Sequence, residues 1–196
     1  MCGLSEGGFV QLNRNSFSQA DRSIRKHVDQ PESIFKFFAK YRHGEDLNIN
    51  KDFFEIELEA LKALERHANI MELKNSFQSL FIDRIEYFVL ELEYFLNGTL
   101  KDVLFNGEGY LYTDHTIFVW CENILDGLSF MHSKKIRHSD IKPGNLFMMP
   151  DYKIKIGDFD LAELDNDTFE CRKMCGTPVY QPPELYSVPV VVGPIK

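Results

Sequence analysis

The folds open to this chain are limited most strongly by one polar loop in its second half. In residues 136–145 the sequence reads Ile-Arg-His-Ser-Asp-Ile-Lys-Pro-Gly-Asn, which brings Asp140, Lys142 and Asn145 into one short segment. An amphipathic stretch with helical periodicity precedes the loop, and a short apolar stretch follows it. Loops held between rigid elements position catalytic side chains well. A carboxylate there can orient a hydroxyl group and accept its proton, an ammonium can neutralise phosphate charge, and an amide oxygen can hold a metal ion.

A second acidic position follows this loop. Asp158 comes 158 − 145 = 13 residues after Asn145, directly after residues 152–156, whose alternating pattern predicts a strand. Mg²⁺ prefers hard oxygen ligands, and a short hairpin can bring the two side chains face to face. Asn145 and Asp158 are therefore candidate metal ligands.

The first half of the chain predicts a small sheet. Residues 34–41 are short and rich in aromatic side chains, as strands are, and residues 77–82 and 86–94 are separated by a polar turn and predict a hairpin. Residues 13–31 are polar, and we interpret them as an extended insertion between two strands.

A helix is predicted from Asn48, and one acid lies on its apolar stripe. The helical wheel places Glu57 among the stripe residues. A buried carboxylate needs a cationic partner, although a carboxylate at the edge of the buried face explains the pattern equally well. The stripe consists of Phe53, Phe54, Leu58, Leu61 and Leu64.

The second half predicts a longer helix before the polar loop. Thr113 is a suitable N-cap, and the helix is expected to end near residues 132–133. A small sheet with one helix, followed by helices around a charged loop, is an α+β pattern in two parts. The apolar residues with a period of 3.6 are Ile117, Cys121, Ile124, Leu125, Leu128 and Met131.

Charge and composition exclude several classes of protein. The chain has 196 residues, with 22 Lys plus Arg against 30 Asp plus Glu, so its net charge is −8 with His neutral. Nucleic acid is not an expected partner, because phosphate binding calls for a basic surface. No apolar stretch is long enough to predict a membrane span. With no visible export signal, four cysteines predict reduced thiols in the cytoplasm, with the nucleus as the alternative.

Three ordered motifs resemble those of the eukaryotic protein kinase family, serine/threonine type. Residues 138–145 resemble the catalytic loop, and Asp158-Phe159-Asp160 resembles the D-F-G element. Residues 176–184, Gly-Thr-Pro-Val-Tyr-Gln-Pro-Pro-Glu, resemble the segment that ends in A-P-E.

The resemblance implies a protein-kinase-like two-lobe fold. We expect a small antiparallel-sheet lobe with one helix over residues 1–95, a partial helical lobe over residues 96–184 and an atypical tail over residues 185–196. A complete kinase domain continues with several further helices after this point, so we interpret the chain as a fragment or an aberrant gene model.

The resemblance also assigns roles to the residues of the polar loop. It makes Asp140 the catalytic base, Lys142 a contact to the γ-phosphate, and Asn145 and Asp158 the Mg²⁺ ligands.

The nucleotide site follows from the same resemblance. Residues 37–40, Phe-Phe-Ala-Lys, occupy the place of V-A-I-K, so Lys40 becomes the partner of Glu57, 57 − 40 = 17 residues later, with Lys26 as the rival. This register puts Phe38 above adenine. The other residues expected to bind nucleotide are Gly7, Gly8 and Leu12 in a glycine-rich loop, Glu93 and Phe95 in the hinge, and Phe147 after the catalytic loop.

The implied function is that of an ATP-dependent protein serine/threonine kinase with Mg²⁺ as cofactor. Lys142 and Thr177 resemble the serine/threonine type, which implies protein substrates phosphorylated on Ser or Thr, while the oligomeric state stays open. The alternatives are a pseudokinase-like nucleotide-binding or interaction module, or an inactive kinase fragment. Val10, Phe38 and Asp160 motivate them, because each departs from the family pattern.

We predict that activation does not require phosphorylation of Thr168. Ser139 stands where many kinases have the arginine that pairs with a phosphorylated activation loop, so a phosphate on Thr168 would lack that partner. Phosphotransfer by Thr168→Ala should stay close to that of the unmodified protein, and an inactive variant would contradict the prediction.

Overall fold

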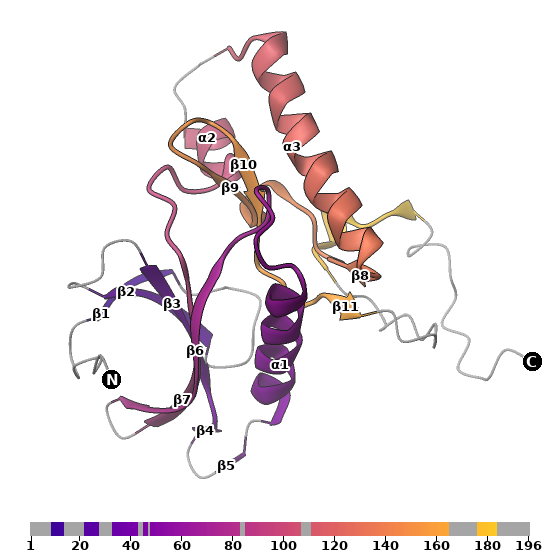
Figure 1. The fold of residues 1–196 in the computed structure, drawn as a ribbon. Coiled ribbons are helices and arrows are strands. Elements are labelled where there is room, and N and C mark those ends of the chain that lie inside the picture. The colour runs from indigo at the N-terminus through magenta and orange to yellow at the C-terminus, as the bar shows by residue number, and fades with distance from the viewer. Residues whose placement is uncertain are drawn as a thin grey trace, which may run out of the picture.

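The chain adopts an α+β fold in the computed structural model. Figure 1 shows a curved sheet with α1 (Asn48–Ala63) beside it, and α2 (Leu100–Asn106) and α3 (Asp114–Ser133) in a second part of the molecule. None of the helices in the described part of the chain combines the length and apolarity that a bilayer crossing requires. The structure describes residues 9–13, 22–27, 33–42, 45–46, 48–82, 85–106, 111–164 and 176–183.

The sheet is antiparallel throughout its five strands, in the order β1-β2-β3-β7-β6. Residues 22–27 form a strand between β1 and β3, so the interpretation of residues 13–31 as an insertion is wrong for this part. The sequence of this strand, Arg-Ser-Ile-Arg-Lys-His, contains one apolar residue and shows no alternation of apolar and polar side chains, so the pattern did not indicate a strand. The strands are β1 (Phe9–Asn13), β2 (Arg22–His27), β3 (Ser33–Ala39), β6 (Leu73–Ile82) and β7 (Ile85–Glu93), with a separate pair β4 (Tyr41–Arg42) and β5 (Glu45–Asp46).

The two faces of β3 belong to different apolar clusters. Ile34 and Phe38 pack in the main core together with α1. Phe35, Phe37 and Ala39 pack on the opposite face with Tyr87 and Val89 of β7. The strand is buried on both faces, and its alternation decides which side chains reach the helix.

The predicted helix and hairpin are both confirmed. In α1, Phe54 and Leu61 are buried against the sheet, and Phe54 meets Phe38 edge to face with ring centroids 5.7 Å apart. Asn50 Nδ2 donates to the carbonyl oxygen of Ala39 at 2.8 Å, which ties the start of α1 to the end of β3. The hairpin pairs β6 with β7 and is longer than predicted at its first strand, which begins at Leu73.

The second part of the molecule is built on α3. Thr113 is its N-cap as predicted, and its side chain accepts a hydrogen bond from the backbone N–H of Thr116. At Gly127 the helix lies close to a short strand, β10 (Ile154–Ile156), because a Cβ atom there would lie 2.9 Å from the Ile156 side chain.

The apolar stripe predicted for α3 is only partly buried. Trp120, Gly127 and Met131 are buried, whereas Ile117 and Leu125 are 47% and 64% exposed. The periodicity predicted the helix correctly, but the predicted stripe included exposed side chains, such as Ile117 and Leu125, beside the buried Met131. The remaining elements are β8 (Ile136–Arg137) paired with β11 (Glu163–Leu164), β9 (Leu146–Met148) paired with β10, and the 3₁₀ turns Pro143–Asn145 and Pro178–Tyr180.

The strands of the five-stranded sheet and α1 precede residue 96, and α2, α3 and the two-stranded pairs β8–β11 and β9–β10 follow it. The division into lobes at residues 95 and 96 stays a prediction. The tail from residue 185 lies outside the described residues.

We predict that Phe38→Ala lowers the free energy of unfolding by about 3–5 kcal/mol, because Phe38 is fully buried against α1. Phe105→Ala is the matched control, since this ring is 71% exposed and its loss should change stability by about 0.5 kcal/mol or less. Urea unfolding followed by circular dichroism measures both, and equal effects would contradict the assigned packing.

Candidate active site

The site is organised around the buried ammonium of Lys36, at the middle of β3. Its Nζ lies 2.8 Å from Oε2 of Glu57 on α1, and both side chains are almost completely excluded from solvent. Lys36 shares a strand face with Ile34 and Phe38, and this face turns toward α1. The acid on the apolar stripe of α1 therefore has the cationic partner that its burial requires.

The predicted pairing of Lys40 with Glu57 is wrong. Lys40 follows the last residue of β3, and its backbone N–H donates to the carbonyl oxygen of Glu86 at 2.9 Å. Its Nζ lies 2.6 Å from Oε1 of Glu86 and 4.4 Å from the ring centroid of Phe88. The strand ends before Lys40 could continue the alternation toward the helix.

This shift of four residues also moves the neighbouring assignments. With Lys36 in the lysine position, Ser33-Ile34-Phe35-Lys36 takes the place of V-A-I-K. The expectation that Phe38 stands above adenine is wrong, because Phe38 is packed against Phe54 in the core. A signal for Lys36 was present in the sequence, since Ile34 and Phe38 flank it at a spacing of two and define the apolar face of the strand.

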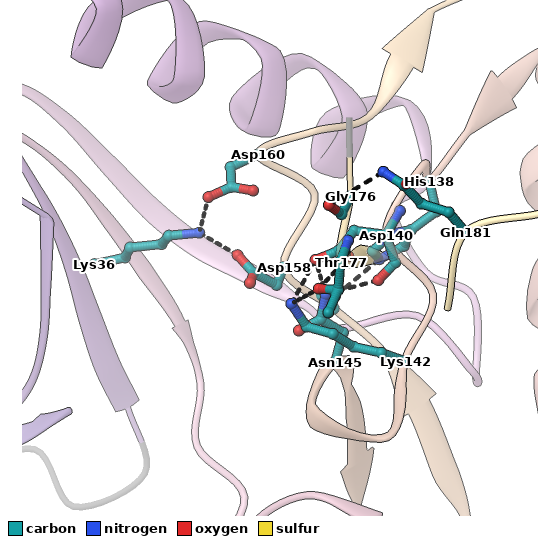
Figure 2. Close-up of polar contacts among 11 residues, drawn as sticks. Lys36, His138, Asp140, Lys142, Asn145, Asp158, Asp160, Gly176, Thr177 and Gln181 are labelled. Atoms are coloured by element: carbon teal, nitrogen blue, oxygen red, sulfur yellow. Dashed lines mark hydrogen bonds and ion pairs between the residues drawn. The ribbon is translucent and has the colours of Figure 1, made fainter. Parts of the chain in front are cut away.

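Two further carboxylates reach the same ammonium (Figure 2). Asp158, which follows β10 and Gly157, makes an ion pair with Lys36 through Oδ1. Asp160 Oδ2 lies 3.4 Å from the same nitrogen. Three elements distant in the sequence therefore meet at one positive charge.

These contacts change the protonation behaviour of both partners. Burial opposes the charge of Lys36, but the attraction of Asp158, Asp160 and Glu57 outweighs it and raises the pKa of the ammonium. Burial raises the pKa of Glu57 to about 7, against the opposing attraction of Lys36. Lys36 therefore stays protonated, and Glu57 is the group of this pair that titrates near neutral pH.

Asp140 and Lys142 lie together in the polar loop, and Thr177 joins them (Figure 2). Lys142 Nζ lies 2.6 Å from Asp140 Oδ2 and donates to Thr177 Oγ1 at 2.8 Å. The backbone N–H and the hydroxyl of Thr177 donate to Asp140 Oδ1 at 2.7 and 2.8 Å. The preceding Gly176 has φ +96°, and a Cβ atom there would lie 2.5 Å from the carbonyl oxygen of Ser139, so this close approach requires glycine.

Asn145 connects the loop to the segment that carries Asp158. Its Nδ2 donates to the backbone oxygen and to Oδ2 of Asp140, at 2.9 and 3.2 Å. The backbone N–H of Gly157 donates to the carbonyl oxygen of Asn145 at 3.0 Å. Because the side-chain nitrogen of Asn145 donates to Asp140, its side-chain oxygen Oδ1 can serve as a metal ligand. The carboxylate of Asp158 can serve as a second ligand. This hard-oxygen donor set fits Mg²⁺.

The buried side chain of His138 packs against the segment that carries Asp158. The His138 ring lies 5.1 Å from the Phe159 ring, centroid to centroid, and its Nε2 is 3.0 Å from the carbonyl oxygen of Gly157. Burial lowers the pKa of His138, while the contact with Gly157 opposes this effect. His138, a member of the polar loop, thus contacts Gly157 and Phe159 on either side of Asp158.

The residues expected at the hinge lie where β7 ends. Glu93 Oε2 lies 2.7 Å from Nζ of Lys155 on β10. Phe95 is buried and packs against Phe147 of β9, with ring centroids 5.1 Å apart. The structure thus brings Glu93, Phe95 and Phe147 near the junction of the two parts, and their contact with a nucleotide stays a prediction.

Other predicted positions are placed less fully. Gly7, Gly8 and Thr168 lie outside the described residues. Leu12 belongs to β1, the edge strand that β2 separates from β3, so the backbone of Phe9–Asn13 is a strand and not a loop.

Comparison with known proteins gives one consistent family. Residues 16–190 match the family model described as "Protein kinase domain". The chain is 33% identical over 179 residues to the "Serine/threonine-protein kinase H1 homolog" of Danio rerio, and 34% identical over 179 residues to "Serine/threonine-protein kinase H1" of Homo sapiens. Each alignment covers 89% of this chain and 39% of the relative, so the chain spans about two fifths of the length of these relatives. It is also 29% identical over 180 residues to "Serine/threonine-protein kinase WNK" of Caenorhabditis elegans, covering 90% of this chain and 9% of that protein.

We predict that ionisation of Glu57 makes the free energy of unfolding fall as the pH rises from about 4.5 to about 7. Its pKa of about 7 in the folded protein exceeds the usual glutamate pKa of 4.5, so its contribution to stability is complete below pH 4.5 and is lost as the pH rises through 7. The free energy of unfolding should therefore fall across this window relative to that of Glu57→Gln. Glu59→Gln is the control on the exposed face of α1, and its pH profile should follow that of the unmodified protein.

Proposed function

Since this chain belongs to the protein kinase family, we propose that it transfers the γ-phosphoryl group of ATP to serine and threonine hydroxyls of protein substrates. The observation that carries the proposal is the ion pair between Lys36 of β3 and Glu57 of α1, together with Asp158 at the same ammonium. In protein kinases a lysine of this kind, paired with a helix glutamate, must be in place for phosphoryl transfer.

Lys36 and Glu57 have different roles in this proposal. Lys36 binds and orients the nucleotide phosphates, while Glu57 keeps the ammonium directed into the site. A Mg²⁺ ion bound by Asn145 and Asp158 would neutralise part of the phosphate charge. Positioning and charge neutralisation account for most of the rate acceleration in this chemistry.

Asp140 and Lys142 act on the transferred group and the acceptor. Asp140 orients the substrate hydroxyl and accepts its proton, and Lys142 faces the transferred phosphate. Thr177 forms hydrogen bonds with both side chains. This contact and the similarity to proteins named serine/threonine-protein kinase support Ser and Thr hydroxyls as acceptors. Retention of all these groups favours a catalyst over a binding module or an inactive fragment.

We predict that Lys36→Met reduces phosphotransfer by about 100-fold or more, whereas Lys40→Met stays within about threefold, because only Lys36 lies at the site. The assay measures transfer of labelled γ-phosphate from Mg²⁺·ATP to a Ser/Thr peptide library by the intact protein. Equal losses in the two variants would contradict the assignment of Lys36.

Asp140→Asn is the second test, because it keeps the shape of the side chain and removes the base. A loss of about 100-fold or more is expected, with an unchanged circular dichroism spectrum. Full activity of this variant, or no transfer by the unmodified protein, would contradict the proposed function.

A further inference from the structure

An ion pair between Arg137 and Glu163 joins two segments of the site and has no part in the proposed reaction. Arg137 Nη2 lies 2.7 Å from Oε2 of Glu163, and the two residues face each other in the antiparallel pair of β8 and β11 (Figure 1). The Arg137 side chain is 41% exposed and that of Glu163 is 16% exposed, so solvent screens this pair less than a fully exposed one. Opposite charges placed across two strands in this way stabilise their pairing.

The ion pair lies close in sequence to residues of the site. Arg137 directly precedes His138 in the polar loop, and Glu163 comes 163 − 158 = 5 residues after Asp158. The same two segments also meet where His138 Nε2 lies 3.0 Å from the carbonyl oxygen of Gly157. The segment that carries the proposed base and the segment that carries a proposed metal ligand are therefore joined at several points, and the ion pair is the one made by two charged side chains.

Residue 139 does not supply a positive charge to this region. Ser139 stands where many kinases have an arginine, and in kinases phosphorylation orders the activation loop through new pairs between arginine and phosphate. Arg137 carries a positive charge two residues earlier, and the Glu163 carboxylate that it meets belongs to the chain itself. This negative charge is present without any modification, whereas a phosphate must be added.

Resting on the proposed function, we propose that the ion pair of Arg137 with Glu163 takes the place of a phosphate-dependent contact and holds Asp140 in its catalytic position without phosphorylation. Arg137 and Glu163 are positioning residues, because they act through the loop that carries Asp140. The ion pair of Lys36 with Glu57 does not involve them. Loss of the Arg137 contact should therefore slow phosphoryl transfer and leave nucleotide binding in place.

Charge reversal tests the pair in the intact protein, by initial-rate measurements of γ-phosphate transfer. Arg137→Glu and Glu163→Arg each place like charges opposite one another, and each should lower kcat about fivefold to tenfold while the KM for Mg²⁺·ATP changes less than about twofold. The double variant Arg137→Glu/Glu163→Arg restores opposite charges and should return kcat to within about twofold of that of the unmodified protein.

Lys153→Glu is the matched control. Lys153 Nζ lies 2.8 Å from Oδ2 of Asp151, but this exposed pair belongs to the turn between β9 and β10 and joins no separate segments. Its reversal should change neither kcat nor KM.

The dependence of kcat on phosphate is the second readout. Protein treated with a phosphatase for phosphoserine and phosphothreonine, and shown by mass spectrometry to carry no phosphate, should keep its kcat within about twofold. A pair with only a structural role would not give this independence.

Each outcome decides the proposal. Unchanged kcat in the single variants, a double variant as slow as they are, or a loss of kcat on dephosphorylation overturns it and leaves the proposed function intact. No transfer by the unmodified protein overturns the proposed function and this inference together. If circular dichroism shows that a charge-reversed variant unfolds, Glu163→Gln should lower kcat about threefold, and Arg137→Lys, which keeps the charge, should retain at least about half of it.

Discussion

The buried charge of Lys36 is the interaction on which the arrangement of the site depends. An ammonium in an apolar interior must be paired, because the cost of an isolated buried charge exceeds the stability of most domains. Lys36 obtains its partners from α1 and from the segment after β10, so the strand, the helix and the second part of the molecule meet at one nitrogen atom. The position of α1 against the sheet follows from apolar packing, but its rotational setting is specified by Glu57.

A second network extends this arrangement to the polar loop. The backbone of Gly157 donates to Asn145, and Asn145 donates in turn to Asp140, so the segment carrying Asp158 and the loop carrying Asp140 are joined by hydrogen bonds. Such a continuous set of bonds fixes distances between groups that the chemistry uses together. The loop needs little regular structure of its own because its neighbours define its shape.

The sequence predicted the second part of the site better than the first. Asp140, Lys142 and Asn145 lie within one loop, so their proximity is a local property that spacing alone reveals. Lys36 and Glu57 are brought together by strand register and helix rotation, which depend on where β3 ends. A four-residue error in that register assigned the pair to Lys40, although the acid itself was found from its place on the helix stripe. Strand β2 was missed because its six residues, with one apolar side chain among them, do not alternate. The contact of Asp160 with Lys36 is a tertiary one, which spacing does not reveal.

The ion pair of Glu93 with Lys155 is a direct contact between the two parts of the molecule. It joins the end of β7 to β10 at the point where the chain leaves the sheet. In the sheet register Lys36 lies opposite Leu90, three residues before Glu93 and so about 10 Å along the strand. At about 10 Å from this contact, a change of about 6° in the angle between the two parts would displace Lys36 by about 1 Å relative to Asp158. The contacts of Lys36 with Asp158 and Asp160 are therefore sensitive to small differences in the angle between the two parts.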